Sequence, residues 1–140
     1  MNINYIAVLV AAVAQFIFGA IWYMPVFGKL WGKIHGFDTL SKEAQAEMTK
    51  KMAPLLIVQF IGTVVTTAVF SMLLNELPNT WHAYGLGGFL WLGFIVPTQI
   101  AAVIFGGTNP KWFVQKSLIM AGAALGCIMI AAFVLQAFTK

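Results

Sequence analysis

Residues 117–138 decide the fold and read SLIMAGAALGCIMIAAFVLQAF. The run contains no Asp, Glu, Lys or Arg, and a helix of this length crosses about 30 Å of hydrocarbon. Three further uncharged apolar runs occupy about residues 3–24, 54–74 and 84–105. Because backbone polar groups in lipid must be paired within the chain, each run is expected to be a helix. The sequence predicts an all-α, integral membrane four-helix bundle that forms one domain over residues 1–140.

The segment between the first two runs, residues 25–53, is the longest polar stretch, and it is too short to bury a core of its own. Its residues 26–35 place apolar side chains on one helical face and lysines on another, which predicts a cytoplasmic amphipathic helix at the membrane surface. Pro25 is expected to break the first span, and Pro54 is expected to start or kink the second.

The charges predict how the chain is inserted. All eight basic residues are lysines, and seven of them fall in the first and third loops, whereas the other side carries only Lys140. By the positive-inside rule, these two loops should be cytoplasmic and both termini outside. We expect a bacterial inner membrane protein whose oligomers, if formed, are parallel. The lysines flank spans and do not form one basic face, so nucleic acid is not an expected partner.

The end of the first run carries a family resemblance. Residues 19–25 read GAIWYMP, and Phe27-Gly28-Lys29 and Trp31 follow. This stretch resembles the signature of an uncharacterised membrane family, catalogued as domain of unknown function 1761, and the layout of the whole chain is similar. The resemblance implies a small multi-span membrane protein. It supplies no reaction, ligand or catalytic residue.

Uncharged polar side chains in the first three runs fall at a similar depth, slightly cytoplasmic of the membrane centre. Pro97 is also expected to free the carbonyl of Gly93, a feature of ligand sites in transporters. This polar layer is a candidate binding site or narrow permeation path, but interhelical hydrogen bonds of about 0.6–2 kcal/mol that hold the bundle together are the commoner role of such residues. The candidates are Gln15, Gln59, Thr63, Thr67, Pro97, Thr98 and Gln99.

Small residues recur at fourfold spacing on two spans, which predicts close helix packing. They are Ala7, Ala11 and Gly19 on the first span, and Gly122 and Gly126 on the fourth. Because each helix of a bundle already buries one face, a second tight face predicts a partner, either another copy in a parallel homo-oligomer or a larger membrane complex.

Trp22, Tyr23 and Trp31 are candidates for an aromatic cage around a cation, although both membrane interfaces also recruit such residues as anchors. His35 and His82 are predicted on opposite membrane sides, so no metal site is expected. The chain lacks phosphate-binding glycine loops and a plausible catalytic serine arrangement. We therefore expect no cofactor and no enzyme activity.

Three functions stay open: a channel or carrier for a neutral or weakly charged small solute, a non-catalytic accessory or scaffold subunit, and a lipid- or pigment-binding module. Each is compatible with a helical membrane bundle, because fold alone does not set function. Solute flux, co-purification with a complex and a bound small molecule would distinguish them.

Overall fold

The computed structural model describes residues 3–78 and 81–139, and every regular element in this part of the chain is a helix. The elements are α1 (Tyr5–Ile21), a π-helix (Trp22–Val26), α2 (Gly28–Ile34), a 3-10 turn (Phe37–Thr39), α3 (Lys42–Glu76), α4 (Ala83–Leu90), a π-helix (Trp91–Ile95), α5 (Val96–Phe105), a 3-10 turn (Pro110–Trp112) and α6 (Phe113–Phe138). The all-α prediction is confirmed.

Within the described residues, four helical stretches are long and apolar enough to cross a membrane. They are Tyr5–Val26, Lys42–Glu76, Ala83–Phe105 and Pro110–Phe138. Each contains one of the apolar runs or nearly all of it. The stretches indicate a small polytopic membrane protein whose outer surface contacts the bilayer.

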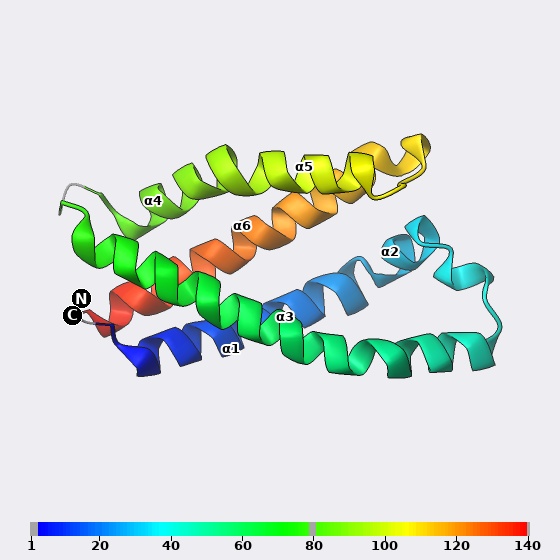
Figure 1. Cartoon of the computed structure of the whole chain (residues 1–140), viewed down its shortest axis with the longest axis horizontal. Coiled ribbons are helices and arrows are strands. Elements are labelled where there is room, and N and C mark those ends of the chain that lie inside the picture. The colour runs from blue at the N-terminus through cyan, green and yellow to red at the C-terminus, as the bar shows by residue number, and fades with distance from the viewer. Residues whose placement is uncertain (1–2, 79–80, 140) are drawn as a thin grey trace.

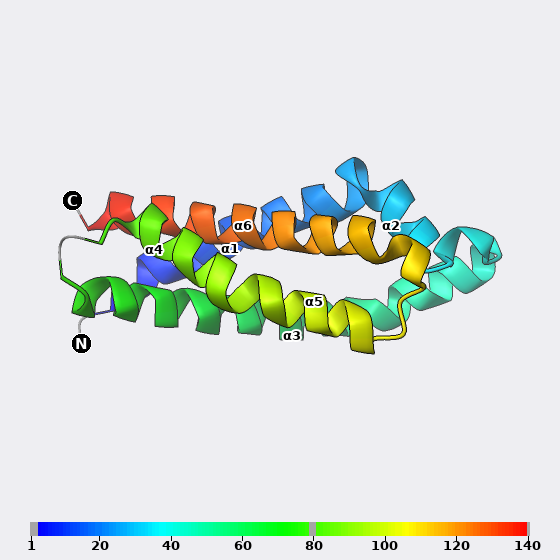
Figure 2. The same ribbon diagram turned by 90° about the horizontal axis from the view of Figure 1, so that it is seen from above.

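The helices meet at one end of the bundle and separate at the other (Figures 1 and 2). α6 packs against α1 and also against α4 and α5, while α3 packs across α1 and touches α4. We call residues 3–12, 67–78, 81–90 and 128–139 the converged end. We call residues 22–56 and 92–118 the splayed end, where the end of α5 and the start of α3 lie far apart (Figure 1).

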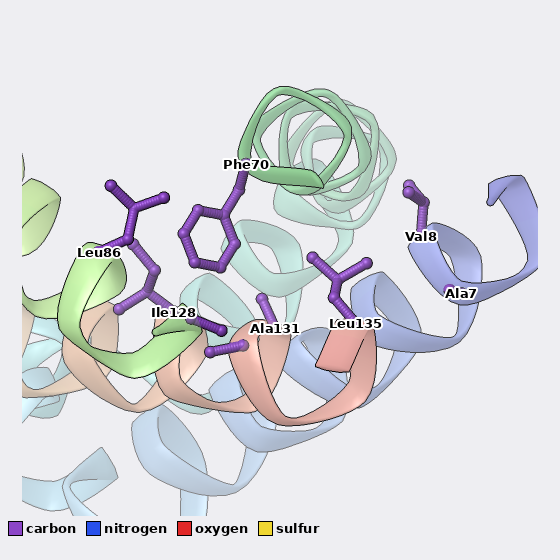
Figure 3. Packing of buried hydrophobic residues seen from close by; sticks show 9 residues of the cluster. Ala7, Val8, Phe70, Leu86, Ile128, Ala131 and Leu135 are labelled. Atoms are coloured by element: carbon purple, nitrogen blue, oxygen red, sulfur yellow. The ribbon is translucent and has the colours of Figure 1, made fainter. Parts of the chain in front are cut away.

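The core lies at the converged end. Phe70 of α3 points towards Leu86 of α4 and Ile128 of α6 (Figure 3). Ala7 and Ala131 are almost fully buried beside this cluster. Small side chains let helix backbones approach closely, and van der Waals packing of this kind drives association in lipid. The core therefore holds the converged end together.

Two spans pass through a π-helical turn close to a proline. Proline lacks an N–H and crowds the carbonyl four residues earlier, and a wider turn relieves the crowding. In the first span, the Phe27 N–H donates to the Trp22 carbonyl at 2.9 Å, with Pro25 between them. The Val96 N–H likewise donates to the Trp91 carbonyl, just before Pro97. The first span thus continues past Pro25 to Val26 instead of breaking there.

α3 is longer than the sequence predicts. It runs for 35 residues from Lys42 to Glu76 without interruption at Pro54, and the Ser41 hydroxyl caps it by accepting the Ala44 N–H at 3.2 Å. A helix of this length measures about 52 Å, well above the roughly 30 Å of hydrocarbon. The first turns of α3 extend beyond α1, α5 and α6 at the splayed end (Figure 1).

Candidate functional site

A polar pocket of about 460 Å³ lies at the converged end, a volume typical of small-molecule sites. Its walls come from the start of α1, the end of α3, the start of α4 and the end of α6. The polar lining residues are Asn4, Ser71, Asn75, His82, Gln136 and Thr139. The pocket exists because all four spans end here and bring short polar side chains to one place.

The lining contains no Asp, Glu, Lys or Arg among the described residues. Amides and hydroxyls both donate and accept hydrogen bonds, so they match uncharged polar groups. Some of this capacity is used within the protein. Asn4 Oδ1 accepts the Ala7 N–H at 3.1 Å, and the Thr139 hydroxyl bonds to the Leu135 and Gln136 carbonyls.

A buried hydrogen-bonded bridge joins α1 and α3 one helical turn from the pocket. Ser71 lines the pocket, and Thr67, which is only 1% exposed, lies one turn earlier on α3. Gln15 Nε2 of α1 donates to Thr67 Oγ1 at 2.8 Å and to the Ala11 carbonyl at 3.1 Å. The Thr67 hydroxyl in turn donates to the Thr63 carbonyl at 2.7 Å. The bridge is therefore a buried polar pair close to the pocket wall.

The family model described as a protein of unknown function (DUF1761) matches residues 6–136. The chain belongs to the DUF1761 family. The resemblance seen in residues 19–31 is therefore confirmed. The DUF1761 match includes the Gln15–Thr67 bridge and every pocket-lining residue except Asn4 and Thr139. Searches among curated proteins and solved structures found no match to the chain.

The structure does not bring the seven predicted polar-layer residues of this DUF1761 chain into one site. Gln15 and Thr67 meet, and the half-buried Thr63 hydroxyl donates to the Gln59 carbonyl at 3.0 Å. The side chains of Gln59, Pro97 and Thr98 are exposed, Gln99 is partly buried, and Thr98 Oγ1 donates to the Phe94 carbonyl. Depth gives the level of a residue but not its direction around the helix, which turns about 100° per residue.

The three predicted cage residues also separate into two groups. Tyr23 and Trp31 form an edge-to-face pair with centroids 4.8 Å apart. Trp22 instead packs against Phe18 and Phe27. The Trp31 ring already faces a cation of the chain, because Lys116 Nζ lies 5.8 Å from its centroid. An external cation would have to displace this lysine.

The glycine face of α6 is occupied within the protein. A Cβ added at Gly122 would lie 2.8 Å from Trp22 Cζ2, and one at Gly126 would overlap the Phe18 ring. The Trp22 indole also donates to the Ile119 carbonyl at 3.0 Å. The face at Gly122 and Gly126, which the sequence predicts to pack closely, thus receives aromatic side chains of α1. Ala7 and Ala11 are buried, whereas Gly19 has open space beside it.

Most of the pocket residues were not found by sequence reasoning. Asn4, Gln136 and Thr139 stand near chain ends, and only folding brings them to α3. One signal was readable: Thr67, Ser71 and Asn75 recur every four residues, which places successive members on neighbouring parts of one helix face.

Proposed function

We propose that the protein is a carrier for a small uncharged solute, which loads into the pocket at the converged end. The observation that carries the proposal is a pocket of amide and hydroxyl groups whose Ser71 lies one helical turn from the buried Gln15–Thr67 hydrogen bond. Polar groups inside a membrane are costly unless they are paired or used.

The chemistry of the pocket favours a solute with several hydroxyl or amide groups. Hydroxyl and amide side chains from the ends of α1, α3 and α6 lie beside apolar surface from Ala7, Leu74 and Leu135. Apolar walls with a few polar groups are the usual composition of a small-molecule site. Ions are a poorer match, since the described lining contains no Asp, Glu, Lys or Arg.

The bridge is weak enough to open. An interhelical hydrogen bond in a membrane protein contributes about 0.6–2 kcal/mol, so breaking it costs at most about a thirtyfold change in population. A minor open state of a few per cent would therefore be available for passage. In the proposed cycle, the solute replaces the bond between Gln15 and Thr67 with its own hydrogen bonds.

The test is swelling of liposomes that contain the purified protein, with urea, glycerol and erythritol as uncharged probes. Ser71→Leu fills the pocket next to the bridge, whereas Val69→Leu changes a side chain that is 50% exposed on the same helix. We expect at least tenfold slower protein-dependent swelling for Ser71→Leu and no change for Val69→Leu. Gln136→Leu, also in the pocket wall, is the second variant if Ser71→Leu does not fold.

Two outcomes contradict the carrier proposal. One is a wild-type swelling rate equal to that of empty liposomes for all three probes. The other is an unchanged rate in a pocket variant whose helical content and elution volume match those of the wild type.

A further inference from the structure

Two polar atoms at the splayed end are buried without a hydrogen-bond partner among the described residues: Gln99 Oε1 on α5 and Ser117 Oγ on α6. Other polar side chains inside the bundle are bonded. Gln15 donates to Thr67, and the Trp91 indole donates to the Ala121 carbonyl at 2.8 Å. A buried polar atom with no partner costs its full desolvation penalty, so two of them on packed helices call for an explanation.

The two atoms belong to helices that are neighbours in space. α5 and α6 are in contact and are joined by a short connection, so they run antiparallel (Figure 2). Gln99 precedes the end of α5 at Phe105 by six residues, and Ser117 follows the start of α6 at Phe113 by four. At about 1.5 Å per residue, they lie roughly 9 Å and 6 Å from the same connection. Their levels differ by less than one helical turn. Each also shares a buried helix face. Gln99 lies one turn before Val103, which is almost fully buried. Ser117 lies one turn before Ala121, whose carbonyl accepts the Trp91 indole N–H.

The chemistry of the pair defines what would satisfy it. Gln99 Oε1 can only accept a hydrogen bond, whereas the Ser117 hydroxyl can donate or accept. Both atoms are uncharged, so they do not require a charged ligand. Lys116, the residue before Ser117, is already engaged: its ammonium donates to Thr108 Oγ1 at 3.1 Å and lies over Trp31. One small molecule with an O–H group could donate to Gln99 and bond to Ser117 at once.

We propose that the α5–α6 interface holds a small uncharged hydroxyl donor that bridges Gln99 and Ser117. A water molecule and a solute hydroxyl are the two sources of this chemistry. The inference is independent of the pocket at the converged end, since it concerns other helices and other residues.

A double-mutant cycle tests the bridge. Gln99→Met and Ser117→Ala remove the polar atoms at nearly constant volume, and Gln115→Leu is an exposed control on α6. Unfolding in mixed micelles with increasing SDS, followed by circular dichroism, measures the folding equilibrium constant. We expect each single variant to lower this constant about three- to tenfold and the double variant to lower it no further. Such non-additivity reports a shared partner, because the two side chains do not bond each other.

The cycle is run in glycerol-free buffer and again with glycerol. Coupling in glycerol-free buffer identifies water as the bridge, and coupling only with glycerol identifies a solute hydroxyl. Additive effects in both buffers, or single variants more stable than the wild type, would overturn the proposal, because the two atoms would then be dry and unshared.

Discussion

The two ends of this bundle are built from similar apolar sequence and yet differ in where their polar side chains lie. At the converged end, small residues such as Ala7 and Ala132 let the spans approach, and polar side chains line a pocket or pair. At the splayed end, bulky side chains such as Phe105 face outwards, and Thr98 is exposed. Small residues therefore allow close helix packing where they face a neighbouring span.

The largest effect should come from filling the glycine notch of α6, the space at Gly122 and Gly126 that receives aromatic side chains of α1. Gly126→Leu places a side chain where the Phe18 ring lies, so we expect a loss of about 3 kcal/mol in the free energy of unfolding, at the upper end for overpacking. Gly62→Leu is the control, since an added Cβ meets nothing within 4 Å there. Unfolding with SDS measures both. Equal losses in the two variants would show that the notch does not hold the helices together.

A smaller effect should follow from removing the buried amide between α1 and α3. Gln15→Leu deletes the bond to Thr67, while the Thr67 hydroxyl keeps its bond to the Thr63 carbonyl. We expect a loss of about 0.6–2 kcal/mol in the free energy of unfolding. Gln59→Leu changes an exposed amide and should cost nothing measurable. A Gln15→Leu protein as stable as the wild type would leave the bridge without a structural role.

The smallest effect should come from the projecting turns of α3. Glu47 and Lys51 form an ion pair of 3.2 Å whose side chains are 69% and 75% exposed. Exposed pairs four residues apart contribute only about 0.3–0.5 kcal/mol and are screened by salt. Glu47→Gln should therefore change the free energy of unfolding by no more than this amount. A loss above 1 kcal/mol, on the order of a buried hydrogen bond, would mean that these turns pack against something.

Hydropathy was sufficient to predict the membrane spans because each run is long and free of charge. The burial of Ala7 and Ala11 also agrees with their fourfold spacing. The sequence predicts less well which side chains of neighbouring spans pack against each other. Gly122 and Gly126 predict a helix-packing face, and in the structure the aromatic rings of Phe18 and Trp22 occupy it. Spacing along one helix identifies a face without identifying its occupant.

The candidate site was only partly predictable for a geometric reason. Residues eight positions apart, such as Gln59 and Thr67, differ by about 80° around a helix, which separates a lipid-facing side chain from a buried one. The pocket adds a second difficulty, since Asn4, Ser71 and Gln136 become neighbours only after four chain segments have met. No local pattern carries that information.

The unbroken length of α3 has a mechanical consequence. Its first turns extend beyond α1, α5 and α6 (Figure 1), its middle crosses α1, and its last turns supply Ser71 and Asn75 to the pocket wall. One continuous helix therefore connects these three parts of the molecule. A displacement of the first turns near Lys42 would reach the pocket wall along this helix, without a signal having to pass through the side chains between them.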